Sequence, residues 1–243
     1  MIENETLKLA VLIDADNAQA SICAELLGEI AKFGIASIKR AYGDWTTTNL
    51  KSWKPHLHKH AIQPVQQFSY TQGKNSTDSS LIIDAMDLLH EGNLDGFCLV
   101  SSDSDFTRLA TRIRESGLTV FGFGEHKTPE PFVSACDKFV YTEILRKIDK
   151  NSTPAPVNSD GLSNKKLKSI IEDAVEAVSK EDGWATLAGV GGYINKNNPS
   201  FDPRNYGFYK LSKLIKSLSY IEIKREQFTD GSSNSHIYVR TKS

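Results

Sequence analysis

Cysteine is scarce in this chain of 243 residues, which holds three, an odd number without CxxC spacing. Cys23, Cys98 and Cys136 lie in apolar stretches, so we expect buried reduced thiols rather than disulfides or a zinc site. No apolar run approaches the length that crosses a bilayer, and the amino terminus lacks the basic-then-apolar pattern of a signal peptide. We therefore expect a cytoplasmic protein without membrane contact.

Net charge is also small, at −1, but it is unevenly spread. Residues 1–146 hold 14 Lys and Arg against 19 Asp and Glu, a net −5. Residues 147–162 hold 2 against 2, and residues 163–243 hold 13 against 9, a net +4. An acidic first part and a basic last part fit a metal site beside a module that binds a polyanion.

Short apolar stretches alternate with helical patterns from residue 8 to residue 141. This alternation predicts an α/β fold, a doubly wound parallel sheet with helices on both faces. We expect Gly34 and Gly117 as C-terminal helix caps and Ser76 as an N-cap. The strands are expected at 9–13, 37–42, 62–66, 96–101 and 119–123, and the helices at 18–33, 48–60, 77–90, 105–115 and 131–135.

The composition changes at residues 149–164, which are rich in Pro, Ser and Asn and offer little to bury. We expect a linker there, between a first domain at 1–148 and a second at 165–243. Three helices closed by a hairpin predict that the second domain is a small winged helix, a frequent frame for nucleic-acid binding. Its helices are expected at 165–179, 187–195 and 208–218, its strands at 220–225 and 236–240, and the wing tip at 229–232.

Pairs of acids follow two of the expected strands. Asp14 and Asp16 come after the first strand, and Asp103 and Asp105 come after the fourth. Ligands of an open parallel sheet collect at the carboxyl ends of its strands, so these acids share one crevice if the two strands are neighbours. Because clustered carboxylates repel one another, the pattern predicts a bound divalent metal ion. The alternatives are a strand-ending turn at Asp14 and a helix-dipole role for Asp105.

The helix expected at 77–90 contributes a further acid. Its apolar residues form one arc, and Asp78 lies at the centre of that arc, where a lone carboxylate would be buried unpaired. We therefore place Asp78 at the metal site, with a simple interaction at the helix amino terminus as the alternative. Asp84, at the margin of the arc, is either a supporting acid or the partner of a nearby Arg or Lys. Asp87 points the opposite way and is expected on the surface.

Three other polar residues near the acids have two interpretations each. Asn17 either supports the acids or, like Asp16, caps the following helix. Ser101 can donate to a phosphate oxygen or to a metal-bound water, although strand-end hydroxyls are common. Lys74 either contacts a substrate phosphate or is an ordinary loop lysine.

The run of His56, His58 and His60 looks like a metal site at first sight. On a helix only His56 and His60 share a face, and lysines are interleaved with them, so we expect a solvated surface instead.

Three blocks in the first domain together resemble the NYN domain, the LabA-like branch of the PIN-like nucleases. They are VLIDADN at 11–17, KNSTDSSLIIDAMDLL at 74–89 and FCLVSSDSDFTRLA at 97–110, and the resemblance covers residues 7–146. It implies a doubly wound sheet and a ribonuclease that uses Mg or Mn. The implied metal-binding catalytic acids are Asp14, Asp78, Asp103 and Asp105, with Asn17, Asp84 and Ser101 in support.

The last part of the chain resembles the OST-HTH or LOTUS domain, a winged helix that implies RNA binding. GYI at 192–194 and NPSFDPRNYGFYKLSKLI at 198–215 carry this resemblance, which covers residues 165–241. We expect the apolar residues at helical spacing to be core rather than base-stacking groups. They are Tyr206, Phe208, Leu211, Leu214 and Ile215. The candidates for phosphate contact are Arg204, Lys210, Lys213 and Lys216.

Together these patterns predict a metal-dependent ribonuclease whose basic second domain delivers the RNA. One alternative is a non-catalytic RNA-binding adaptor that holds a metal ion without turnover. Another is a phosphatase of the haloacid dehalogenase type, because Asp14-Ala15-Asp16 and Ser102-Asp103 imitate its motifs. Ala18, where that family has Thr or Val, and the lack of a cap domain argue against the phosphatase. A homodimer or a protein partner bound through the second domain is left open.

Overall fold

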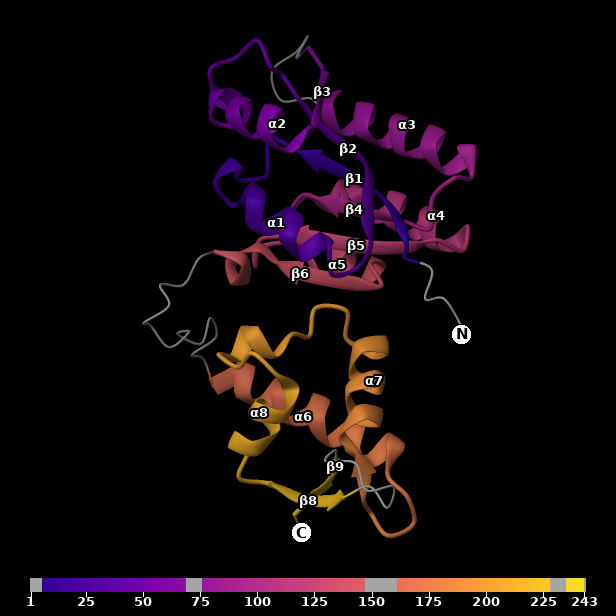
Figure 1. Cartoon of the computed structure of the whole chain (residues 1–243), viewed down its shortest axis with the longest axis vertical. Helices are drawn as coiled ribbons and strands as arrows, with labels where there is room; N and C mark the ends of the chain where they lie inside the picture. Colours follow the sequence, from indigo (N-terminus) through magenta and orange to yellow (C-terminus); the bar gives the residue numbers. More distant parts are fainter. Residues whose placement is uncertain (1–5, 69–75, 147–160, 228–234, 243) are drawn as a thin grey trace. The chain divides into compact units, whose positions relative to one another are not determined.

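The structure is a computed structural model, and it describes residues 6–68, 76–146, 161–227 and 235–242. The chain divides into two compact units, Met1–Lys147 and Ile148–Ser243, each with its own core (Figure 1). Lys74 and the expected wing tip at 229–232 lie outside the described residues. None of the helices in the described ranges has the length and apolarity needed to span a membrane.

The first unit is built on a six-stranded parallel sheet with the order β3-β2-β1-β4-β5-β6. This arrangement confirms the predicted doubly wound sheet, since the chain winds outward from β1 in one direction and from β4 in the other. The last strand was not predicted, although the equally short strand at the other edge was. The strands are β1 (Lys8–Asp14), β2 (Ile35–Gly43), β3 (Gln63–Gln66), β4 (Gly96–Val100), β5 (Thr119–Gly124) and β6 (Lys138–Tyr141).

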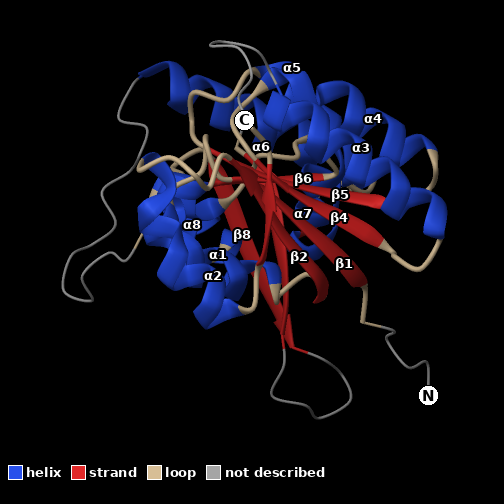
Figure 2. Ribbon diagram, turned by 90° about the horizontal axis from the view of Figure 1, so that it is seen from above, coloured by secondary structure: helices blue, strands red, loops and turns tan. Residues whose placement is uncertain are grey.

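Helices cover both faces of this sheet, with α1 and α2 on one side and α3 and α4 on the other (Figure 2). The α-helices are α1 (Cys23–Ile30), α2 (Lys54–His60), α3 (Ser76–Glu91), α4 (Thr107–Glu115) and α5 (Glu130–Ala135). Short 3₁₀ helices are η1 (Ala20–Ile22), η2 (Asn49–Trp53), η3 (Ser104–Phe106) and η4 (Thr142–Leu145). Every predicted helix of this unit is present, and three of them begin with a 3₁₀ turn.

The alternation of side chains along β1 explains why the unit has two cores. Val11 and Ile13 pack with α1 and α2, whereas Ala10 and Leu12 pack with α3, α4 and α5. All the residues of β1 after Lys8 are buried, as expected of a central strand covered on both faces. The strand is thereby fixed, and so is the position of Asp14 at its end.

The two predicted C-cap glycines turn out to differ. Gly117 follows Ser116, the C-cap residue of α4, and has φ +84°, the left-handed conformation in which helices often end. Gly34 is not in that conformation, and the C-cap prediction is wrong there. A Cβ on Gly34 would lie 2.4 Å from the carbonyl oxygen of Leu7, so the glycine allows a close approach of two backbones.

The described residues of the second unit form three α-helices and a three-stranded antiparallel sheet of order β7-β9-β8. Its first helix begins at Gly161, four residues before the expected start. The two-residue strand β7 was not predicted. The elements are α6 (Gly161–Val178), β7 (Ala185–Thr186), α7 (Leu187–Asn197), η5 (Pro203–Tyr206), α8 (Leu211–Ser217), β8 (Ile221–Gln227) and β9 (Ser235–Thr241).

Candidate active site

The site begins where β1 and β4 end side by side. The two strands pair in parallel with Ile13 opposite Val100, so Asp14 and Ser101 leave the sheet together. The strand order reverses at this pair, because β2 follows β1 on one side and β5 follows β4 on the other. The expectation that the two acid-bearing strands are neighbours is therefore confirmed. Such a reversal is where ligands of open α/β sheets bind.

Asp14 is completely buried and held by hydrogen bonds from both strands' ends. Its Oδ2 accepts from Ser101 Oγ at 2.7 Å and from Asn17 Nδ2 at 2.7 Å, and its Oδ1 accepts from the Asn17 amide at 3.3 Å. Burial raises the pKa of Asp14, while these hydrogen bonds oppose the shift and the charge of Asp16 adds to it. Asn17 thus bonds to Asp14, and it does not cap the following 3₁₀ helix, which begins after Gln19.

Asp103 and Asp105 stand in the turn that follows β4. The amide of Asp103 donates to Ser101 Oγ at 3.1 Å, and Asp103 Oδ1 accepts from the amide of Asp105 at 2.9 Å. Asp103 is therefore the N-cap of η3. Because that cap uses one lone pair of one oxygen, the Asp103 carboxylate keeps further acceptor capacity for a cation.

Asp78, in the first turn of α3, completes a cluster with these two acids. Carboxylate oxygens of Asp78, Asp103 and Asp105 all lie within 4.8 Å of one another. Burial raises the pKa of Asp78 to about 6, and the charges of Asp14, Asp103, Asp105 and Asp16 contribute in that order. Across the described residues, no Lys or Arg forms an ion pair with Asp78 or Asp103.

Asp16 also belongs to this neighbourhood, as expected of an acid in the shared crevice, and it does not cap the following 3₁₀ helix. Thr77 Oγ1 donates to Asp16 Oδ2 at 3.1 Å, which ties the turn after β1 to the start of α3. The charge of Asp16 raises the pKa of both Asp14 and Asp78. Its position two residues after Asp14, at the same strand end, was the feature of the sequence that indicated this place.

Asp84 occupies a different environment on α3. Its carboxylate accepts from the guanidinium of Arg40 and from the hydroxyl of Tyr42, both on β2. Of the two interpretations of Asp84, the structure favours the basic partner, since none of its hydrogen bonds joins it to the acid cluster. The Asp84 carboxylate and burial raise the pKa of Tyr42, burial being the larger cause.

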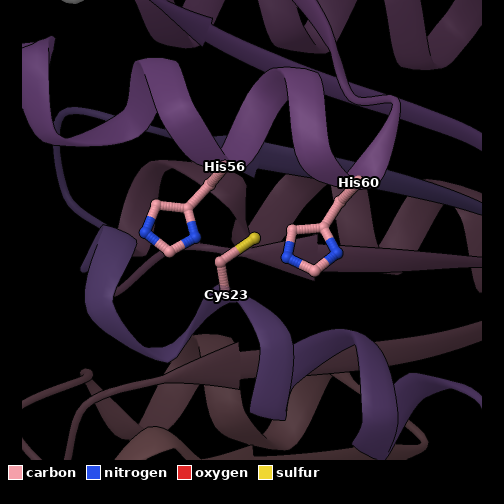
Figure 3. A group of neighbouring side chains, drawn as sticks. All are labelled: Cys23, His56 and His60. Carbon is pink, nitrogen blue, oxygen red and sulfur yellow. The ribbon is translucent and has the colours of Figure 1, made fainter.

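The histidines of α2 are not arranged as expected. His58 is exposed, but His56 and His60 are partly buried, and their rings stack with centroids 6.2 Å apart. The prediction of a solvated face is wrong for these two residues, because α2 turns them toward α1, where Cys23 lies (Figure 3).

The residues expected to contact RNA in the second unit fall into two groups. Lys210, Lys213 and Lys216 are exposed around α8. Arg204 was expected to be exposed like the lysines, but it is only partly exposed. Its guanidinium donates to both carboxylate oxygens of Asp202, at 3.0 and 2.7 Å. Tyr209, 72% exposed beside these lysines, is a candidate that sequence reasoning missed. Most apolar residues of the same block pack in or against the core, so the sequence pattern did not single it out.

The fold and the site define an α/β domain with clustered acids at the switch point of its sheet, joined to a winged-helix-like unit. The NYN domain model matches residues 8–145, and the OST-HTH/LOTUS domain model matches residues 162–232. The chain therefore belongs to the NYN domain family and carries an OST-HTH/LOTUS domain at its C-terminal end. No curated protein matches it.

Solved structures resemble parts of the chain. A protein of unknown function from Vibrio parahaemolyticus, 18% identical, aligns over 58% of this chain and 96% of its own with a TM-score of 0.50, which shows a shared fold. An uncharacterized protein from Nitrosomonas europaea is 29% identical over 40% of this chain and 87% of its own, with a TM-score of 0.31. A fragment from Chromobacterium violaceum is 34% identical over 36% and 86%, with a TM-score of 0.26.

Proposed function

We propose that this protein is a metal-dependent ribonuclease that hydrolyses phosphodiester bonds at the acid cluster. The observation that carries the proposal is the convergence of Asp78, Asp103 and Asp105 within 4.8 Å beside the buried Asp14. A folded chain gains nothing from bringing four carboxylates together unless a cation offsets their repulsion. Membership of the NYN family, a group of PIN-like nucleases, supports the same chemistry.

The donor atoms fit Mg²⁺ or Mn²⁺. All four acids offer carboxylate oxygens, the hard ligands that these ions prefer. Asp14 Oδ2 already accepts two hydrogen bonds and Oδ1 accepts one, so one acceptor position on Oδ1 is left for a cation. When bound, either ion would act as a Lewis acid on the phosphate and lower the pKa of a water that attacks phosphorus.

The residues of the chain have separate tasks in this proposal. Asn17 and Ser101 fix the orientation of Asp14, and Ser101 also fixes the turn that carries Asp103. Asp78, with a pKa of about 6, is the acid that most readily holds a proton, and it has to release that proton before a cation binds. Asp84 supports the site indirectly, by anchoring α3 to β2 through Arg40.

The second unit is proposed to bind the RNA. The acids of the first unit repel a polyanion, whereas residues 163–243 carry a net +4 and three exposed lysines around α8. Tyr209 lies exposed next to Lys210, and an aromatic ring among lysines is a surface on which a single-stranded base can stack. The match to the OST-HTH/LOTUS domain supports this division of tasks.

The phosphatase alternative requires Asp14 to attack a phosphate ester directly. Its carboxylate is 0% exposed, and both oxygens accept hydrogen bonds, so no observation favours that role. The adaptor alternative has the same site without turnover, and the experiment below separates it from the nuclease.

The test is cleavage of a labelled mixed-sequence RNA by the purified chain, with Mg²⁺, with Mn²⁺ and with EDTA. We expect metal-dependent cleavage that falls at least about 100-fold in Asp103→Asn, because the metal's stabilisation of the transition state is worth several kcal/mol. Asp14→Asn should lose activity to the same extent. Asp87→Asn, on the exposed side of α3, is the matched control and should cleave like the wild type.

Two outcomes would contradict the proposal. Equal cleavage by Asp103→Asn and the wild type would mean that another site, or another protein in the preparation, cuts the RNA. RNA binding without cleavage under any metal condition would establish the adaptor instead.

A further inference from the structure

A second group of metal-ligating side chains lies away from the acids, between α1 and α2. Cys23 is the first residue of α1, and His56 and His60 lie one turn apart on α2. The Cys23 sulfur and one ring nitrogen of each histidine lie within 4.8 Å of one another. Figure 3 shows the thiol between the two imidazoles, with a ring nitrogen of each facing the sulfur.

Two ring nitrogens in this group are buried without any hydrogen bond. His56 Nδ1 and His60 Nε2 have no solvent contact and no partner among the described residues. An unpaired buried polar atom costs free energy, and native proteins seldom keep one without a reason. Two such atoms on one pair of side chains, next to a free thiol that is 0% exposed, call for a shared partner.

We propose that Cys23, His56 and His60 form a second metal site that binds Zn²⁺ or a similar borderline ion, independently of the acid cluster. A thiolate and two imidazoles are the donors that zinc takes in proteins, and two histidines four residues apart on a helix form a common half-site. The acid cluster offers only carboxylate oxygens, so the two sites favour different metals. This inference does not depend on the proposed nuclease activity.

The geometry requires only a small closure around the ion. Tetrahedral coordination at standard zinc bond lengths places the sulfur and nitrogen ligands roughly 3.3 to 3.6 Å apart. Since the present separations are at most 4.8 Å, each has to shorten by no more than about 1.5 Å. Three protein ligands leave the fourth position to water or to an external ligand.

Such an ion would join two helices that the sequence does not connect closely. Cys23 of α1 is buried in the same apolar core as Trp53 of η2 and Leu57 of α2. Apolar packing in this core holds α2 against α1. We therefore expect zinc to stabilise the first unit by mass action.

The experiment uses the full chain after treatment with a chelator. Zn²⁺ alone is titrated in competition with a chromophoric chelator, and Co²⁺ is added separately as a spectroscopic probe of thiolate coordination. We expect one tight equivalent of Zn²⁺ and a near-ultraviolet absorption band from cobalt and sulfur. Cys23→Ser and His60→Ala should each weaken zinc binding more than about 100-fold, because loss of even an outer-shell partner costs 10 to 100-fold.

Two variants serve as controls. His58→Ala changes the exposed histidine of the same helix and should bind Zn²⁺ like the wild type. Asp103→Asn removes an acid from the other cluster and should also keep the tight zinc equivalent. Because Cys23 is fully buried, the folding of Cys23→Ser is checked by thermal unfolding, and His60→Ala, at a partly buried position, gives an independent reading.

Three results would overturn the inference. The first is a wild type without a tight zinc equivalent or without the cobalt band. The second is an equal loss in His58→Ala and His60→Ala, which would indicate surface binding. The third is a loss in Asp103→Asn, which would place the zinc at the acid cluster.

Discussion

Asp78 and Asp84 stand six residues apart on the same helix, α3, and the protein treats them in opposite ways. Asp84 accepts hydrogen bonds from the guanidinium of Arg40 and the hydroxyl of Tyr42, both on β2. Asp78 is surrounded by four further acids, and no basic side chain pairs with it in the described ranges. The chain therefore supplies a counter-charge where an acid holds the fold together. Among the described residues it supplies none to Asp78, where an external cation is expected to bind.

If this contrast is correct, the metal effect depends on Asp78 and not on its neighbours. At a concentration 100 times its dissociation constant, Mg²⁺ or Mn²⁺ should stabilise the folded protein by about 2.7 kcal/mol. Asp78→Ala should remove most of that gain, and Asp87→Ala, exposed on the same helix, should keep it. Thermal unfolding with and without metal measures the difference. Equal losses in both variants would end the argument from the helical face.

Asp84 offers the reverse test. Asp84→Asn should lower the free energy of unfolding by about 2 kcal/mol, because the partly buried Arg40 and the buried Tyr42 lose a charged acceptor. The stabilisation by Mg²⁺ should stay near the wild-type value. Denaturant unfolding at pH 7 measures the first effect, with Asp87→Asn as the control. A variant as stable as the wild type would show that the pairing contributes nothing.

The pH dependence of stability distinguishes the two acids as well. Asp78 has a pKa of about 6 in the folded protein against an ordinary 3.8, so the folded state binds its proton more tightly than the unfolded state. Without metal, stability should fall as the pH rises from about 4 to about 6, by about 1 kcal/mol after allowance for partial exposure. With saturating Mg²⁺ the trend should reverse, since the cation requires the ionised acid.

The measurement is the difference between the wild type and Asp78→Asn in EDTA across that pH range. Asp78→Asn should lack the fall, and Asp87→Asn should retain it. A fall of the same size in Asp78→Asn would assign the raised pKa to another group.

The charge difference between the acidic first unit and the basic second unit predicts a smaller effect, on the salt dependence of RNA binding. In full-length Asp103→Asn, which binds RNA without cutting it in the proposal, Lys213→Ala and Lys216→Ala should each flatten the salt dependence of binding. The slope of log K against log salt should change by about 0.7 for each lost phosphate contact on single strands. Lys168→Ala is the control, since that lysine lies 3.6 Å from Glu172. Fluorescence anisotropy across a salt series measures the slopes, and unchanged slopes would move the RNA site elsewhere.

Much of the first unit could be predicted from the sequence because its signals are local. Apolar strands and amphipathic helices each depend on neighbours within a few residues, and the strand ends then fix where the acids gather. The convergence of Asp78 with Asp103 and Asp105 followed from one helical arc and one strand end. The family blocks pointed to the same residues.

What the sequence could not provide were contacts between distant residues. Cys23 and His60 are 37 residues apart, and the local sequence around either one gives no sign that they meet. The histidines were therefore expected on a solvated surface. The pairing of Arg204 with Asp202, two residues earlier, depends on the backbone of η5. The sequence pattern does not show that conformation, so Arg204 was expected to be exposed. β6 was also missed; only two residues separate it from the end of α5.

One hydroxyl proton has a consequence for the geometry of the whole strand end. Ser101 has a single proton, and it is given to Asp14, so the same oxygen can only accept from the amide of Asp103. The hydrogen bonds therefore run in one direction, from the β4 turn through Ser101 to β1. Their polarity depends on Asp14 remaining an acceptor. Ser101→Thr keeps a hydroxyl that can donate to Asp14 and accept from the Asp103 amide. Ser101→Ala removes both hydrogen bonds, including the one that holds the turn carrying Asp103.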